Sequence, residues 1–296
     1  VLKGPAGAAL YGTSGSNGVV LITTKSGMKG RAGEAFTLNY EGVTGWNEQS
    51  VEYSDDDIVS ADAANDVYRQ GAINQHTLSL AGRSGIFSYF GSFTDRSEEG
   101  IVLQNDFVRR SVRANFDAVP NDQLKLSVST NYIVSENKRP QNDNNIQGWM
   151  GNTILYHTPY AFTDSSAIAA LSNTINSNRF IGSANLTYTP DWLPGLTFNG
   201  LVGIDAIDYT NIAFSPPGFF YPGIEFKGEK TSFSRMRRQM NYEFNAGYAY
   251  DITGAISAVT TVGTQLFNNY TNFSEVTMQN FGSKKVTNLY GATDFI

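Results

Sequence analysis

The chain has 296 residues, of which 16% are charged and 13% aromatic, and its formal net charge is -6. Soluble domains average about 25% charged residues, and an acidic chain without a basic patch argues against nucleic-acid binding. There is no cysteine, which excludes disulfides and thiolate metal sites. There is also no apolar run of about 18 residues, so no transmembrane helix is encoded. Low charge, many aromatic residues and a mean hydropathy of -0.27 are together typical of a membrane β-barrel.

Residues 1–33 are small and rich in glycine, and they differ in character from the rest of the chain. Segment 18–25 is predicted to form a buried strand, because it is a β-branched run that follows a glycine. Gly12, Gly15 and Gly18 suggest tight turns that need positive φ. Their order is not that of a phosphate-binding loop, because Lys25 follows the strand instead of opening a helix. We therefore interpret these glycines as structural.

From about residue 36 the chain changes to segments in which apolar and polar residues alternate. The predicted strands are 37–46, 75–81, 86–94, 108–118, 124–134, 180–188, 196–206, 240–250, a weaker 256–264, and a segment within 288–295. Most of them approach the roughly ten residues that a tilted strand needs to cross a bilayer. Soluble strands more often have about five or six. The lengths therefore favour a wall that spans a membrane.

The connections between the strands give a second signal. Short turns at 82–85, 119–123, 189–195 and 251–254 alternate with longer polar segments at 47–73, 95–106, 135–179 and 208–236. An outer-membrane barrel has this asymmetry, with tight periplasmic turns and long extracellular loops. Aromatic residues near the strand ends are predicted to form its two interfacial girdles: Trp192, Tyr188, Tyr248 and Tyr250 near the turns, and Trp46, Tyr132 and Tyr209 near the loops.

Segment 1–27, VLKGPAGAALYGTSGSNGVVLITTKSG, resembles the closing motif of the plug domain in TonB-dependent outer-membrane receptors of the SusC/RagA-like branch from Bacteroidetes. The residues that carry this plug motif include Gly4, Leu10, Tyr11, Gly12, Gly15, Asn17, Gly18, Thr23, Thr24 and Lys25. Segment 71–102 resembles the early barrel strands of the same branch. The resemblance implies an all-β fold, with the C-terminal part of a plug domain in 1–33 and the first part of a transmembrane antiparallel β-barrel in 34–296. Nine or ten strands would be part of the roughly 22 in the largest plugged barrels.

The resemblance also implies a function in the bacterial outer membrane. It predicts active, TonB-dependent uptake of a large nutrient, either a glycan of several sugars or a peptide. The implied partners are a SusD-like surface lipoprotein, TonB through a segment that precedes this sequence, outer-membrane lipid, and a second transporter–lipoprotein pair in a dimer. No cofactor and no nucleic acid is implied, and the plug motif would serve structure and gating. The alternative is a non-transporting outer-membrane barrel that acts as an adhesin or as a structural component of an envelope complex.

Enzyme function is not expected, because no serine–histidine–acid or paired-carboxylate arrangement can be argued. His76 and His157 lack further zinc ligands nearby, and His76 is predicted to be structural because it lies on the apolar face of its strand. A Ca²⁺ site is an alternative use of one run of carboxylates, although its spacing is not that of an EF-hand: Asp55, Asp56, Asp57, Asp62 and Asp66.

Substrate contact is predicted for two arginines of the barrel wall, Arg109 and Arg113, and for loop residues Asn142, Asn145, Trp149 and Tyr156. Amides beside aromatic rings suit sugars, because they combine hydrogen bonds with stacking. The alternative for the loop is a polar segment that packs on the lumen. Both arginines are expected to face the lumen, since a charge on the lipid face costs about 2–4 kcal/mol at mid-bilayer. The same face is expected for Lys125, Asn131, Asn185 and Asn199.

Overall fold

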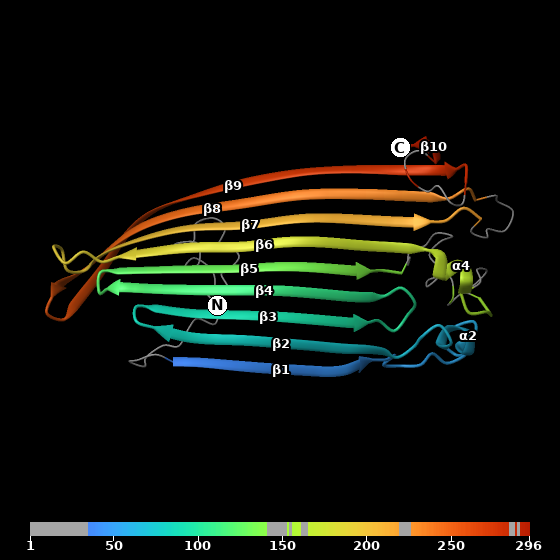
Figure 1. Cartoon of the computed structure of the whole chain (residues 1–296), viewed down its shortest axis with the longest axis horizontal. Helices are drawn as coiled ribbons and strands as arrows, with labels where there is room; N and C mark the ends of the chain where they lie inside the picture. Colours follow the sequence, from blue (N-terminus) through green and yellow to red (C-terminus); the bar gives the residue numbers. More distant parts are fainter. Residues whose placement is uncertain are drawn as a thin grey trace.

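The computed structural model describes residues 35–140, 153, 156–160, 165–218, 226–283, 288 and 291–296. The plug motif in 1–33 therefore lies outside the described residues, as do Asn142, Asn145 and Trp149. The described chain forms one antiparallel sheet, in which ten strands follow one another in sequence order (Figure 1). Among these residues no helix combines the length and the apolar character needed to cross a membrane.

The ten strands lie where alternation predicts them. Their bounds are β1 Ala35–Asn47, β2 Gly71–Ser84, β3 Phe87–Glu99, β4 Asp106–Asn121, β5 Leu124–Lys138, β6 Ser172–Tyr188, β7 Leu196–Ser215, β8 Glu229–Thr253, β9 Ile256–Phe281 and β10 Ala292–Phe295. Two short helices, α2 Ala61–Asn65 and α4 Ser165–Ala170, lie in the connections. The all-β prediction is confirmed, and every strand except β10 is longer than predicted.

The pairing register assigns each strand residue to one of two faces, because directly paired residues share a face and neighbours in sequence do not. One face, the apolar face, carries Leu38, Leu80, Phe93, Val112, Tyr132, Phe180, Val202, Phe244 and Leu266. The other, the polar face, carries Thr77, Ser92, Asp205 and Glu243, together with the residues expected in the lumen: Arg109, Arg113, Lys125, Asn131, Asn185 and Asn199.

The strands extend past their predicted ends toward the long connections. β3 and β4 stay paired as far as Glu99 and Asp106, so the predicted loop 95–106 shrinks to 100–105. That connection is now about as short as the turn 189–195, which weakens the strict alternation of short and long connections. The extensions carry polar residues on both faces; Asp95 in the extension of β3, for example, pairs with Arg110 on the apolar-face side. Backbone hydrogen bonds continue the ladder after the apolar alternation has stopped.

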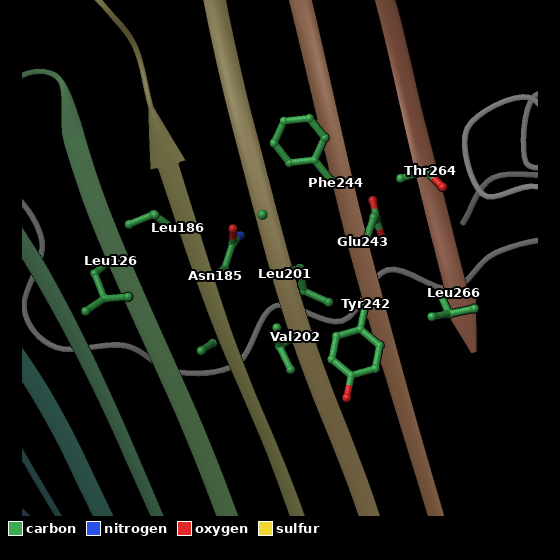
Figure 2. A pocket seen from close by; sticks show the side chains of 12 residues that line it. Leu126, Asn185, Leu186, Leu201, Val202, Tyr242, Glu243, Phe244, Thr264 and Leu266 are labelled. Atoms are coloured by element: carbon green, nitrogen blue, oxygen red, sulfur yellow. The ribbon is translucent and has the colours of Figure 1, made fainter. Parts of the chain in front are cut away.

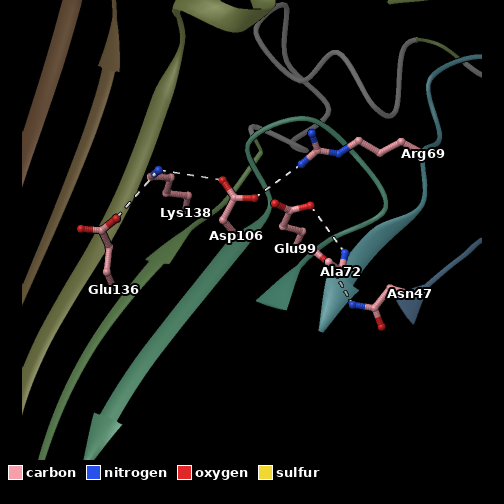
Figure 3. A network of polar contacts seen from close by, with 7 residues as sticks. All are labelled: Asn47, Arg69, Ala72, Glu99, Asp106, Glu136 and Lys138. Carbon is pink, nitrogen blue, oxygen red and sulfur yellow. Dashed lines mark hydrogen bonds and ion pairs between the residues drawn. The ribbon is translucent and has the colours of Figure 1, made fainter. Parts of the chain in front are cut away.

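Short and long connections lie at opposite ends of the sheet, with α2 and α4 at the long-connection end (Figure 1). A polar network ties the strand ends together there (Figure 3). Asp106 forms ion pairs with Arg69 at 3.5 Å and Lys138 at 3.9 Å, and the Asn47 amide donates to the Glu99 carbonyl at 2.8 Å. Exposed ion pairs stabilise by only about 0–1 kcal/mol each, so this network mainly fixes geometry.

The long connections also enclose a hydrophobic core, which we call the cap core. Val67, Val102, Ile168 and Leu171 are buried in it, and they come from three different connections. Phe226 packs against the core from a fourth connection. Beside the core, the Gln104 amide donates to the carbonyls of Ile168 at 3.1 Å and Ala169 at 2.9 Å at the end of α4. The described parts of the long connections therefore form a folded cap.

Most of the predicted girdle residues are on the apolar face: Trp46, Tyr132, Tyr188, Tyr248 and Tyr250. Trp192 lies in the turn and is 70% exposed. Tyr209 is a correction, because β7 continues past its predicted end at 206 and the parity of the strand turns Tyr209 to the polar face. His76 lies on the apolar face as predicted, where its Nδ1 is 2.8 Å from the Tyr40 hydroxyl.

Candidate binding site on the polar face

The polar face is hollowed across β2 to β5 by a cavity of about 460 Å³, which we call the arginine pocket. Three hydroxyl side chains and Phe107 contribute to its lining. The residues that give the pocket its chemistry are Gln75, Arg96, Glu98, Arg109, Arg113 and Asn131. Charged and amide groups therefore converge on one hollow, although they come from four strands.

The register explains how the sequence brings these groups together. Gln75, Arg96 and Arg109 form one directly paired row across β2, β3 and β4. Arg113 pairs directly with Asn131 of β5. Residues at i and i+4 of a strand share a face, so Arg109 and Arg113 point to the same side of β4. The pocket thus follows from strand pairing without any irregular backbone.

The pocket carries positive charge that the described residues do not neutralise. Arg96 donates to Glu98 at 2.6 Å and to the Gln75 side-chain oxygen at 3.2 Å, so its charge has a partner. Arg109 and Arg113 form no ion pair within the described part of the chain. Arg109 lies directly opposite Arg96, and like charges in that relation destabilise a sheet.

An aromatic group on the same face lies on the continuation of the pocket's first row. From Arg109 the row runs through Ser135 and Ser177 to Tyr209, and then to Arg235 and Phe273. The Tyr209 ring meets Phe233 edge-on at 5.9 Å, and Phe233 stacks on Phe273 at 6.4 Å. The Arg235 guanidinium lies 5.1 Å from the centre of the Phe233 ring. We call these residues the aromatic platform.

A second hollow, of about 390 Å³, lies on the apolar face of β5 to β9 (Figure 2). Leu126, Leu186, Val202, Tyr242, Phe244 and Leu266 surround it. Ala184 and Gly200 are also in its lining, and their small size leaves the space open. Asn185 and Glu243 also belong to its lining (Figure 2), although the register assigns their side chains to the polar face, so the hollow itself is mainly apolar.

The structure brings together only part of the predicted contact set. Arg109 and Arg113 share the arginine pocket, whereas Tyr156 is in the connection 139–171 and does not line it. Sequence reasoning missed Gln75, Arg96 and Glu98, because segment 95–106 was predicted to be a loop and the second strand was predicted to begin at residue 75. The available signal was the polar alternation that continues at positions 92, 94, 96 and 98.

Two carboxylates of the acidic run, Asp55 and Asp57, accept hydrogen bonds from nearby residues of the same connection. Asp57 accepts hydrogen bonds from the Ser54 hydroxyl at 2.7 Å and from its amide at 3.0 Å, and these bonds lower the pKa of Asp57 below its ordinary value. Asp55 accepts from the amide of Ala61 at the start of α2, at 3.0 Å. In the described ranges no group of three or more His, Cys, Asp or Glu side chains is arranged to hold a metal ion. The Ca²⁺ hypothesis gains no support from these contacts.

No protein-family model matches the sequence. Among curated proteins, the TonB-dependent receptor SusC of Bacteroides thetaiotaomicron is 22% identical in an alignment 305 positions long. The alignment covers 84% of this chain and 30% of SusC. The TonB-dependent receptor P26 of Formosa agariphila is 25% identical in an alignment 246 positions long, which covers 67% of this chain and 24% of P26. The chain therefore spans less than a third of the length of these relatives.

Two solved structures share the fold. The RagAB peptide importer in its open-open state superimposes with a TM-score of 0.79 at 16% identity, covering 99% of this chain and 40% of that one. The RagAB peptide transporter gives a TM-score of 0.75, also at 16% identity, and covers 96% of this chain and 40% of that one. The ten strands thus have the fold of part of the RagAB barrel, and their two faces differ as those of a transmembrane β-barrel wall do, which is apolar toward lipid and polar toward the lumen. The chain is thus similar in sequence to TonB-dependent receptors, SusC among them, and similar in fold to the RagAB structures.

Proposed function

We propose that the full-length protein containing this chain imports a large nutrient, an oligosaccharide or a peptide, across the bacterial outer membrane in a TonB-dependent way. The observation that carries the proposal is the lumen side of the wall, where the arginine pocket and the aromatic platform offer charge, amides and rings to a passing ligand. The named relatives are receptors, which supports a protein that binds and transports its ligand without catalysing a chemical reaction.

The proposal assigns an orientation and a set of partners. The long-connection end faces the cell exterior and the short turns face the periplasm, as in outer-membrane barrels. A SusD-like lipoprotein would sit over the cap, whose hydrophobic core gives it a fixed shape. Residues 1–33 would end a plug domain, residues 34–296 would form the first part of the barrel around it, and TonB would act on a preceding segment. Two transporter–lipoprotein pairs would form the dimer.

Purification from native outer membranes tests this proposal. The full-length protein, tagged at its own locus, is isolated in mild detergent, and co-purifying proteins and ligands are identified by mass spectrometry. We expect a surface lipoprotein and a bound oligosaccharide or peptide, whose uptake by cells stops when TonB is deleted. Uptake that continues without TonB would contradict import of this kind. Isolation without any lipoprotein partner would favour the adhesin or structural alternative.

A further inference from the structure

We propose that the arginine pocket is an anion subsite that binds a carboxylate or sulfate group of an acidic oligosaccharide. This inference rests on the proposed function, because the pocket meets a ligand only if one passes through the lumen. It goes further by naming the chemical class of that ligand. The groups that bind the anion are Arg109 and Arg113, with Arg96 fixed beside them.

Some arginines of the sheet have a carboxylate partner, whereas Arg109 and Arg113, like Arg235 and Arg237 on the same face, form no ion pair within the described part of the chain. Arg179 meets Asp205 at 2.5 Å, Arg110 meets Asp95 at 2.8 Å, and Arg238 meets Asp208 at 2.9 Å. The direct partners of Arg113 are neutral, Ser92 and Asn131, and those of Arg109 are Arg96 and Ser135. Arg109 and Arg113 differ from Arg235 and Arg237 in that both line the same hollow, where their charges can act together on one ligand.

The geometry suits a planar or tetrahedral oxyanion. A guanidinium presents a rigid fork of donors that matches carboxylate and sulfate oxygens, and such charge-assisted hydrogen bonds are about twice as strong as neutral ones. Arg96 is already held by Glu98 and Gln75, so it adds positive potential without needing to reorganise. A bound anion would also relieve the repulsion between Arg96 and Arg109.

The rest of the row indicates a sugar chain as the carrier of the anion. Amide groups of Gln75 and Asn131 line the pocket, and the same row reaches the aromatic platform at Tyr209. Amides and flat rings together suit sugar hydroxyls and sugar faces. β4 and β7 are three strand spacings apart, roughly 14 Å across the sheet, so a ligand that touches both sites must be an oligomer.

Binding to the purified full-length transporter tests the subsite without any energy source. The probes are oligogalacturonate, which carries carboxylates, a sulfated dextran oligosaccharide, a neutral dextran oligosaccharide of the same length, and an oligoglutamate peptide. Dissociation constants are measured by titration calorimetry at two salt concentrations. We expect at least one acidic oligosaccharide to bind more tightly than the neutral one, with an affinity that falls as salt rises. The two acidic sugars decide between carboxylate and sulfate.

Paired variants locate the binding. Arg109→Gln and Arg113→Gln should each weaken the acidic oligosaccharide about tenfold or more, and leave the affinity for the neutral probe unchanged. Arg110→Gln is the matched control, because it removes the same charge from the next residue of β4 on the opposite face. Arg109→Lys keeps the charge but loses the fork, so it should weaken binding less than Arg109→Gln. It also keeps the test open if the glutamine variant fails to fold.

Several results would overturn the subsite. Equal affinity for acidic and neutral sugars would do so, as would glutamine variants that bind like the wild type. Preferential binding of oligoglutamate would reject the sugar as carrier. If Arg109→Gln and Arg113→Gln lower the thermal stability of the protein but leave its ligand affinity unchanged, the two arginines serve folding and not ligand binding. Anion binding that persists while uptake does not depend on TonB would contradict the proposed function and leave the subsite standing.

Discussion

The wall and the cap are stabilised in different ways, although the connections that form the cap join the strands of the wall. In the wall, side chains of the apolar face remain accessible; Val202 is 45% exposed and Phe244 50% exposed. In the cap, Ile168 and Leu171 are 0% and 1% exposed. The wall satisfies its backbone groups in the ladder and leaves its apolar side chains to lipid, whereas the cap buries apolar side chains away from water. Exposed hydrophobic residues are therefore expected in one region and would be a defect in the other.

The largest expected effect is on the cap alone. Ile168→Ala should remove about 2–5 kcal/mol from the local stability of the cap, because it leaves a cavity in a fully buried site. Hydrogen exchange should rise in 165–171 and 100–105, while the amides of β2 to β8 stay protected. Val51→Ala, at a residue 76% exposed in the connection 48–70, is the control and should change little. Loss of protection throughout the wall would mean that the two regions are not separate.

The next effect tests the two faces of the wall. Val202→Arg places a charge on the lipid side and should cost about 2–4 kcal/mol near mid-bilayer. Leu201→Arg is the matched variant, because Leu201 lies on the polar face directly opposite Glu243, which would accept the new charge. Denaturant unfolding of the protein in lipid vesicles measures both. Equal losses for the two variants would contradict the assignment of lipid and lumen sides.

A smaller effect is expected at the turns of the wall. Gly195 has φ of 92°, and a Cβ there would lie 2.2 Å from the carbonyl oxygen of Ala249. Gly195→Ala should therefore cost about 1–3 kcal/mol, since left-handed backbone and a close carbonyl both oppose a side chain. Gly254→Ala, in a turn where a Cβ meets open space, is the control. Thermal unfolding in vesicles should separate the two, and equal midpoints would show that the turn adapts.

Sequence alone predicted the wall well, because one face must be apolar along every strand that crosses lipid. It failed where that requirement ends. Asp95 and Arg96 lie on an extension of β3 whose two faces are both polar, so alternation no longer marks the strand, yet the ladder continues. The correction at Tyr209 has the same cause, since its face depends on how far β7 runs.

The pocket was predictable only in part. Arg109 and Arg113 could be assigned to one face of one strand from their spacing. Their proximity to Arg96 and Asn131 depends on the register between strands, which is fixed by pairing over the full strand length. The cap core was not predicted, because Val67, Val102 and Ile168 come from three connections that no local pattern links.

The smallest expected effect concerns pH, and it is confined to the cap. Hydrogen bonds from Ser54 lower the pKa of Asp57 in the folded chain, with the hydroxyl as the larger cause. Because the folded pKa lies below the unfolded value of about 3.9, the turn is fully supported above that pH and loses this support as pH falls through the lowered pKa. Ser54→Ala should raise the pKa of Asp57 part of the way back to its ordinary value, since the hydrogen bond from the Ser54 amide remains. Titration of labelled aspartate carboxyls by NMR measures the change, with Ser50→Ala as control. A carboxyl that titrates alike in both variants would mean that the Ser54 hydroxyl does not hold it.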